Sequence, residues 1–366
     1  MNIALNSHIN TQENQMTKVL FILKRREDFN SELHTKIGLQ TGLYNSANFM
    51  NNMLLSHGVD SKLVVVIDNN DIDREVTKYR PDFVFLEALW VVPSKFSVLL
   101  PLHPKVKWVI RIHSEMPFMA GEGIAMDWIG DYSLVKNVIL ACNAPRMLDE
   151  IHNFIKIKNS WTDEQTREKV IYLPNYYPQD YQIKQFNYDK DHIDISCFGA
   201  IRPLKNHLVQ AHAALQFANN LNKKLRFHVN AGRIEMKGEP MINNLRGMFQ
   251  HLAAVGHELI NHLWTPREEF LELCRSMDIG MQVSFSETFN IVAADLISQG
   301  VPVVGSDEIP WLAKSWSALP THTLSIVDKL NLTYLNPLDN VVHNQLSLTN
   351  YTNNIPPIWC KYINGE

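Results

Sequence analysis

Short apolar runs rich in β-branched residues recur along the first half of the chain, with helix-sized gaps between them. They span residues 19–23, 63–67, 83–86, 108–112 and 138–141. In the first gap, residues 47–55 place apolar side chains at helical spacing and end before His57 and Gly58, a pattern typical of a helix C-terminus. Strands that alternate with helices favour a parallel sheet, so the first half predicts a doubly wound α/β domain.

A second series of the same kind occupies the other half of the chain. Its apolar runs span residues 193–198, 225–229, 259–263, 279–283 and 302–304. Between the two series, Leu-Pro-Asn-Tyr-Tyr-Pro at 173–178 and a polar, aromatic stretch to residue 191 have the composition of an interdomain connection. We therefore expect two Rossmann-like domains.

The predicted organisation has five parts. They are a loose leader at 1–16, an N-terminal domain at 17–177, a linker at 178–191, a C-terminal domain at 192–335 and a tail at 336–366. The tail is interrupted by Asn-Pro, Asn-Asn and Pro-Pro pairs, yet its Trp359 and Tyr362 favour docking back onto the domains.

Bulk composition limits the possible partners and the compartment. The formal net charge of −4 and a pI near 6.4 give no overall attraction to nucleic acid or anionic lipid. The most apolar window, residues 83–102, contains Glu87, Lys95 and two prolines, so no transmembrane helix is expected. The first residues lack the pattern of a secretory signal, and the four cysteines are widely spaced. We expect a cytoplasmic protein with free thiols.

Two acidic residues follow a predicted strand of the second half. Glu287 lies at a strand-to-helix turn, and Asp295 lies eight residues later, on roughly the same helix face. Ligands of open α/β sheets bind beyond the carboxyl ends of the strands, where a helix N-terminus also offers amides to phosphate. The pair therefore suits a nucleotide sugar. Alternatively, Glu287 is a charge favoured by the helix dipole, and Asp295 is a solvated residue.

A basic loop follows another predicted strand of the same half. An apolar run ends at Gly199 and leads into a loop that carries Arg202 and Lys205. Two cations three residues apart at the carboxyl end of a strand can neutralise the diphosphate of a leaving nucleotide. The alternative is a solvated loop.

The order and offsets of these motifs resemble the retaining glycosyltransferases of family 4, which have the GT-B fold. Asn175 in Leu-Pro-Asn is similar to a domain-closing Pro-Asn of that family. Residues 199–206 resemble its basic loop, and Asp278 resembles the Asp that opens the strand before its acidic motif. Glu287 and Asp295 match its two acids eight apart, and residues 300–307 match the strand that follows. The resemblance covers about residues 17 to 315 and is stronger in the second half.

This resemblance implies an α/β GT-B enzyme with two doubly wound domains facing across a cleft. Arg202 and Lys205 would contact the diphosphate of the donor and stabilise the leaving group. Glu287 would hold hydroxyl groups of the donor sugar, and Asp295 would hold the ribose. His113 is similar to a cleft-lining histidine near the sugar, although a lone histidine is also a common structural residue.

Further predicted contacts come from the backbone and from the first domain. The donor-binding set comprises Gly42, Gly199, Thr288, Phe289, Asn290 and Asp295, and the set expected to bind the acceptor or a phosphate comprises Lys24, Arg25, Arg26 and Arg111. The sequence departs from the family where Thr288 and Asn290 replace glycines, where Asp295 replaces Glu, and where a single glycine, Gly42, stands for a Gly-Gly turn. A long polar loop precedes Gly42.

The predicted activity is transfer of a hexose or pentose from a nucleotide diphosphate to an acceptor hydroxyl, with retention of configuration. No cofactor or metal is expected, because the basic loop supplies the positive charge and no His/Asp cluster has metal-ligand spacing. The acceptor is a saccharide or glycoconjugate. One alternative is hydroxymethylated cytosine in DNA, for a phage enzyme in host cytoplasm. A further alternative is a nucleotide-sugar epimerase or a non-catalytic nucleotide-sugar-binding protein.

Overall fold

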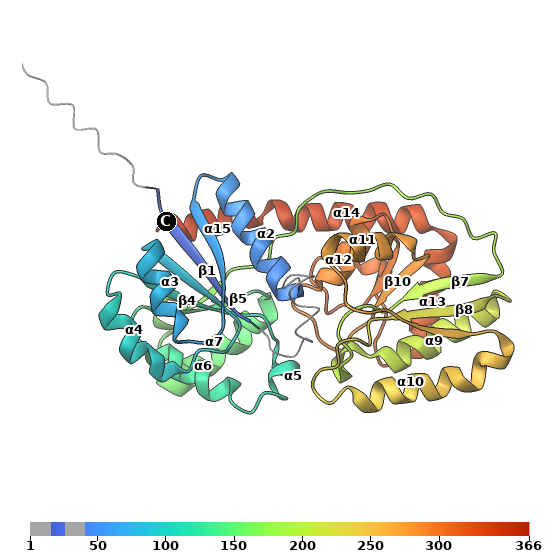
Figure 1. Cartoon of the computed structure of the whole chain (residues 1–366), viewed down its shortest axis with the longest axis horizontal. Helices are drawn as coiled ribbons and strands as arrows, with labels where there is room; N and C mark the ends of the chain where they lie inside the picture. The colour runs from blue at the N-terminus through green and yellow to red at the C-terminus, as the bar shows by residue number, and fades with distance from the viewer. Residues whose placement is uncertain (1–15, 26–40, 366) are drawn as a thin grey trace, which may run out of the picture.

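The protein consists of two α/β domains, each built on a parallel sheet (Figure 1). The computed structural model describes residues 16–25 and 41–365. The first sheet has the strand order β2-β1-β3-β4-β5-β6, and the second has the order β11-β10-β7-β8-β9. All strand pairs in both sheets are parallel. The predicted α/β class with two doubly wound domains is confirmed.

The first domain contains the strands and helices up to residue 172. Its strands are β1 (Lys18–Lys24), β2 (Asp60–Val66), β3 (Phe83–Glu87), β4 (Lys107–Ile112), β5 (Val138–Cys142) and β6 (Val170–Tyr172). Its helices are α2 (Gly42–Ser56), α3 (Asp71–Tyr79), η1 (Pro93–Lys95), α4 (Phe96–Leu102), α5 (Met116–Met119), α6 (Ala125–Leu134), α7 (Pro145–Asn159) and α8 (Asp163–Arg167). The sequence pattern missed β6, because three residues are too few to show a periodicity.

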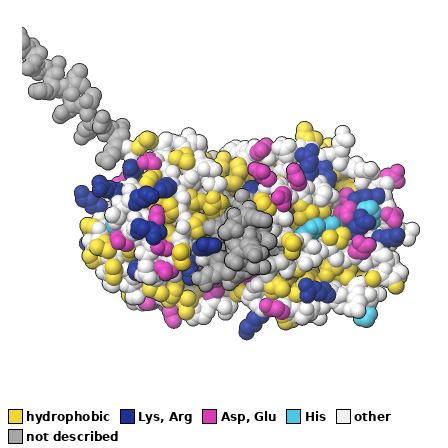
Figure 2. Space-filling view, in the orientation of Figure 1, with side chains coloured by type: hydrophobic (Ala, Val, Ile, Leu, Met, Phe, Trp, Pro, Cys, Tyr) yellow, Lys and Arg dark blue, Asp and Glu magenta, His cyan; other side chains and the backbone are white. Residues whose placement is uncertain are grey.

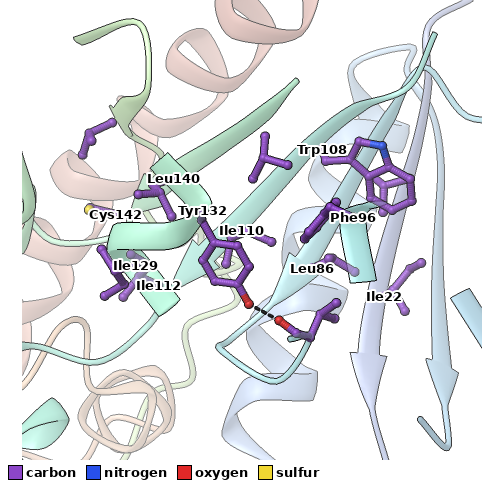
Figure 3. Packing of buried hydrophobic residues seen from close by; sticks show 14 of the residues in the cluster. Ile22, Leu86, Phe96, Trp108, Ile110, Ile112, Ile129, Tyr132, Leu140 and Cys142 are labelled. Atoms are coloured by element: carbon purple, nitrogen blue, oxygen red, sulfur yellow. Dashed lines mark hydrogen bonds between the residues drawn. The ribbon is translucent and has the colours of Figure 1, made fainter. Parts of the chain in front are cut away.

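Aromatic side chains pack one face of this first sheet against α4 and α6 (Figure 3). The Phe96 ring meets Trp108 edge to face, with 5.6 Å between centroids, and meets Tyr132 in the same way at 6.0 Å. The Tyr132 hydroxyl donates to the Val91 carbonyl, so the polar end of this buried ring is satisfied. The apolar runs identified in the sequence form the strands of this sheet, because their side chains fill this core.

The second domain is shorter but has the same construction. Its strands are β7 (His192–Ser196), β8 (Lys224–Val229), β9 (Glu258–Asn261), β10 (Ile279–Gln282) and β11 (Val303–Gly305). Its helices are η2 (Pro203–Lys205), α9 (His207–Asn220), α10 (Glu239–Leu252), η3 (Ala253–Val255), α11 (Arg267–Ser276), α12 (Ile291–Ser298), η4 (Lys314–Trp316) and α13 (Thr323–Leu335). Because β7 and β10 are adjacent, the loops that follow them leave the sheet side by side.

The chain crosses between the domains twice. Residues 173–191 connect them without helix or strand, and α14 (Pro337–Asn353) and α15 (Ile355–Asn364) return to the first domain (Figure 1). The breakers seen in the sequence lie at the starts of these helices, where proline is tolerated because the first amides need no partner in the helix. Trp359 of α15 packs against Phe21 and Phe85 of the first sheet.

The described helices and the cysteines agree with the expectations from composition. Among residues 16–25 and 41–365, no helix is long and apolar enough to cross a bilayer. All four cysteines are free thiols, and Cys142, Cys197 and Cys274 are buried.

Replacement of Trp359 tests whether the returning helix stabilises the first domain. The side chain is fully buried, and its indole N–H donates to the Pro174 carbonyl oxygen at 2.9 Å. Trp359→Ala should lower the free energy of unfolding by about 3–5 kcal/mol, measured by urea titration with circular dichroism. Lys361→Ala, an exposed position on the same helix, is the control and should change it by no more than about 0.5 kcal/mol. Equal effects of the two changes would contradict this assignment.

Candidate active site

The two motif loops of the second domain meet in a buried ion pair. Lys205 ends η2, and Glu287 lies between β10 and α12. The Lys205 Nζ lies 2.5 Å from the Glu287 Oε1, and both side chains are at least nine-tenths buried. Burial lowers the pKa of Lys205, while the Glu287 carboxylate opposes that shift. The sequence had predicted both residues as catalytic, and the structure brings them together.

Side-chain amides hold the basic loop in place. Asn206 has a left-handed backbone, with φ of 58°, and its Nδ2 donates to the carbonyl oxygens of Val283 at 3.1 Å and Pro320 at 2.7 Å. Gln210 donates to the Lys205 carbonyl at 2.7 Å and accepts from the Val283 amide at 2.8 Å. These bonds join the loop after β7 to the loop after β10, so the position of Lys205 depends on both.

Gly199 and Asn290 mark the points where the two loops turn. Gly199 has φ of 110°, a conformation that favours glycine. Asn290 has φ of 60°, and asparagine tolerates the left-handed region better than most residues. Its Oδ1 accepts from the Ala293 amide at 2.9 Å, and its Nδ2 donates to Gln282 at 3.0 Å. Asparagine therefore supplies here both the turn that a glycine would make and an N-cap for α12.

Asp295 lies on α12 and is engaged by two residues that the sequence did not single out. Its Oδ1 accepts from Arg267 at 2.7 Å and from the Tyr177 hydroxyl at 2.8 Å. Burial raises the pKa of Asp295, and the Arg267 guanidinium opposes that shift. Asp295 still lines the cleft, so the predicted contact to a ribose stays a prediction. Arg267 and Tyr177 carry no motif of their own, because their relation to Asp295 arises only in the folded chain.

Arg202 lies where the second domain faces the first. Its guanidinium lies 4.7 Å from the centre of the Phe118 ring of α5, and its Nη1 lies 3.7 Å from the Glu235 Oε2. The side chain is half-buried, so the cation is held at the cleft without being sealed from it. This placement is compatible with the predicted contact to a diphosphate.

The first domain contributes a second buried ionic group. Glu87 ends β3, and both its oxygens lie 3.0 Å from the Arg111 Nη1. The His113 Nε2 lies 2.6 Å from the Glu87 Oε2, and Arg111 also donates to the Asn175 Oδ1 at 2.7 Å. Burial favours neutral Glu87, but Arg111 and His113 outweigh it, so the pKa of Glu87 is lowered. Burial lowers the pKa of His113.

Arg111 requires a correction. The sequence placed it among residues that bind the acceptor or a phosphate, but its side chain is fully buried and does not line the cleft. It bonds to Glu87 and to Asn175 of the Leu-Pro-Asn segment, and its guanidinium lies 4.9 Å from the centre of the Trp359 ring. A buried guanidinium has to be paired, and Glu87 and Asn175 accept from its two terminal nitrogens. Arg111 is therefore a structural residue behind the cleft wall.

A cleft of about 370 Å³ lies between the domains and gathers most of the predicted residues. The predicted residues that line it are Lys24, Gly42, His113, Gly199, Arg202, Lys205, Glu287, Thr288, Phe289, Asn290 and Asp295. Arg25 is exposed outside this lining, and Arg26 lies outside the described residues. A Cβ on Gly42 would come within 3.2 Å of the Ile291 side chain, so glycine lets α2 approach the start of α12.

The cleft offers both charge types that a phosphorylated, polyhydroxylated ligand needs. Cations and carboxylates both line it, and several of them, including Glu87, Arg233 and Arg267, carried no signal in the sequence. Within the described ranges, no three His, Cys, Asp or Glu side chains are grouped to bind a metal ion. Carboxylates accept from hydroxyl groups, and Lys and Arg bind phosphate oxygens.

Solved structures resemble this chain over nearly its whole length. No protein-family model and no curated protein matches the sequence significantly. A UDP-forming α,α-trehalose-phosphate synthase from Burkholderia vietnamiensis superposes with a TM-score of 0.64 at 9% identity, over 96% of this chain and 97% of that chain. HepE of Anabaena, in complex with UDP and glucose, gives 0.62 at 11% identity over 96% and 100%. Sucrose-phosphate synthase from Thermosynechococcus elongatus gives 0.64 at 12% identity over 95% and 98%. The predicted GT-B fold is confirmed.

Replacement of Glu87 tests the buried charges of the first domain. A carboxylate with a lowered pKa stabilises the fold above its ordinary value of 4.5 and loses that contribution as the pH falls through the lowered pKa. Glu87→Gln leaves Arg111 unpaired, so urea titration at pH 7 should show a loss of about 3–5 kcal/mol. Part of the decrease in the free energy of unfolding at acid pH should disappear as well.

The control for this change is Glu258→Gln. Glu258 is exposed and lies 3.9 Å from Arg226, so its replacement should change stability by at most about 1 kcal/mol. A Glu87→Gln protein as stable as this control at pH 7 would show that the Glu87 and Arg111 charges are not interdependent.

Proposed function

We propose that this protein is a glycosyltransferase that moves a sugar from a nucleotide-diphosphate donor to an acceptor hydroxyl group. The observation that carries the proposal is the buried pair of Lys205 and Glu287 in the wall of an interdomain cleft, with Arg202 on the same wall. The cations suit the diphosphate, where negative charge develops during transfer, and the carboxylate suits sugar hydroxyls. The GT-B fold of the solved glycosyltransferases that resemble this chain supports the same reading.

In the proposed reaction, the bond between the anomeric carbon and the diphosphate oxygen breaks, and a bond from that carbon to the acceptor oxygen forms. The acceptor proton passes to the leaving phosphate. Arg202 and Lys205 stabilise the leaving group, so the mechanism needs no metal ion. Retention of configuration, by attack from the face that the phosphate leaves, follows from the resemblance to family 4.

A UDP-hexose is the proposed donor. HepE was solved with UDP and glucose, and the trehalose-phosphate synthase is described as UDP-forming. Both superpose on 96% of this chain, which supports a donor of the same class for the cleft lined by Lys205 and Glu287. UDP-glucose is therefore the first donor to test.

A saccharide or glycoconjugate is the proposed acceptor. On the face drawn in Figure 2, Lys and Arg side chains are interspersed with Asp and Glu over both domains. DNA binding depends on several cations that neutralise successive phosphates. A mixed surface and a net charge of −4 favour an uncharged acceptor over hydroxymethylated DNA.

A thermal-shift panel with UDP, GDP, ADP, CMP and their common sugar conjugates tests the proposal. A ligand at one hundred times its Kd should stabilise the fold by about 2.7 kcal/mol, which raises the Tm by a few degrees, roughly 2–4 °C. We expect UDP and UDP-hexoses to respond and the other bases to respond less. The responding donor is then incubated with saccharides, and release of the nucleotide diphosphate is measured.

The alternatives give different results in the same assays. An epimerase would interconvert donor sugars without an acceptor, and a binding protein would respond to the nucleotide but turn nothing over. A DNA-modifying enzyme would bind duplex DNA with a steep dependence on salt. A panel without any response would contradict the proposal.

A further inference from the structure

A chain of hydrogen bonds crosses the cleft from the first domain to Thr288 of the second. It begins at Glu87, whose Oε2 lies 2.6 Å from the His113 Nε2. The His113 Nδ1 lies 3.3 Å from the Asn143 Nδ2, which also donates to the Thr288 hydroxyl oxygen at 3.4 Å. That hydroxyl in turn donates to the His113 carbonyl oxygen at 3.2 Å.

With the Asn143 amide nitrogen directed at His113 and Thr288, these hydrogen bonds define one arrangement of protons. The Asn143 amide nitrogen has two hydrogens, and it points one at the imidazole and one at Thr288. The His113 Nδ1 is then an acceptor, so its proton is on Nε2 and faces Glu87. Asn143 is fully buried, whereas Thr288 and His113 are half-buried at the cleft.

Thr288 is the residue through which this series of hydrogen bonds reaches the second domain. It follows Glu287 directly, and Glu287 is held by Lys205. A shift of the Thr288 side chain therefore moves the carboxylate that lines the donor half of the cleft. Glycine, which is usual here in the family that the sequence resembles, could form neither of the two side-chain bonds.

We infer that the Thr288 hydroxyl is a positioning group that sets the spacing between the wall formed by His113 and Glu87 and the wall formed by Glu287 and Lys205. This inference rests on the proposed function, because the spacing matters for transfer between a donor on one wall and an acceptor on the other. The sequence had indicated Thr288 only for its backbone amide. The side chain acts through His113 and Asn143, without contact to the reacting atoms.

Two substitutions separate the hydroxyl from the shape of the side chain. Thr288→Val keeps the branched shape and removes both hydrogen bonds, whereas Thr288→Ser keeps the hydroxyl. With a UDP-sugar and its acceptor, Thr288→Val should lower kcat about 10-fold and leave the donor KM within about 2-fold, because a misplaced wall impairs reaction more than binding. Thr288→Ser should stay within about 3-fold of the wild type in kcat.

A second measurement does not require turnover. Small-angle X-ray scattering of the ligand-free proteins should give a larger radius of gyration for Thr288→Val than for the wild type and Thr288→Ser, because the cleft loses a bond between its walls. Glu308→Ala is the matched control. It removes another contact between the domains, the 2.5 Å bond from Arg146 to Glu308, leaves Arg146 paired with Glu115, and should leave kcat unchanged.

The outcomes distinguish this inference from the proposed function. If the wild type transfers sugar and Thr288→Val is equally fast, or if Ser and Val are equally impaired, the inference is wrong and the function stands. If the wild type turns over no nucleotide sugar, the function is wrong, and scattering alone decides whether Thr288 holds the walls together. An unchanged radius of gyration in Thr288→Val would then overturn the inference too.

Discussion

The arrangement of the cleft depends on two opposite charges that are buried together, on Lys205 and Glu287. The residues are 82 positions apart in the chain, and their charged atoms are 2.5 Å apart in the fold. Either charge buried alone would cost several kcal/mol, so the loops after β7 and β10 are stable only at this spacing. Asn206 and Gln210 fix the same spacing through the backbone. The second domain thus presents a preorganised charged wall to the cleft.

The first domain also contains a buried pair of opposite charges. Glu87 and Arg111 are buried together, and Arg111 continues to Asn175 at the connection between the domains. Trp359, which arrives from the far end of the chain, covers the guanidinium and bonds to the residue before Asn175. The cleft wall of the first domain, the connection between the domains and α15 share these contacts. The orientation of the two domains is therefore coupled to the candidate site. This group reaches the cleft through Glu87, His113 and Asn175.

Much of the fold could be predicted from the sequence, because parallel strands buried on both faces appear as apolar β-branched runs. The short strand β6 and the helical tail could not, since three residues show no period and prolines at helix starts look like breakers. Lys205 and Glu287 were singled out because they follow predicted strand ends and because the order and offsets of their motifs resemble those of a known family. The burial of Arg111 could not be predicted from the sequence, since arginine is mostly exposed in proteins. Only its partners in the folded protein, Glu87 and Asn175, account for the burial.

The central claim of the proposed function is that Lys205, held in place by Glu287, contributes to binding of the donor diphosphate. Calorimetric titration of UMP and UDP tests it, with the wild type and with the double variant Lys205→Met/Glu287→Gln, which leaves no buried unpaired charge. The account predicts that the wild type binds UDP about 10- to 100-fold more tightly than UMP and that the double variant, still folded by circular dichroism, loses most of this preference. The same preference for UDP in both proteins would contradict the account.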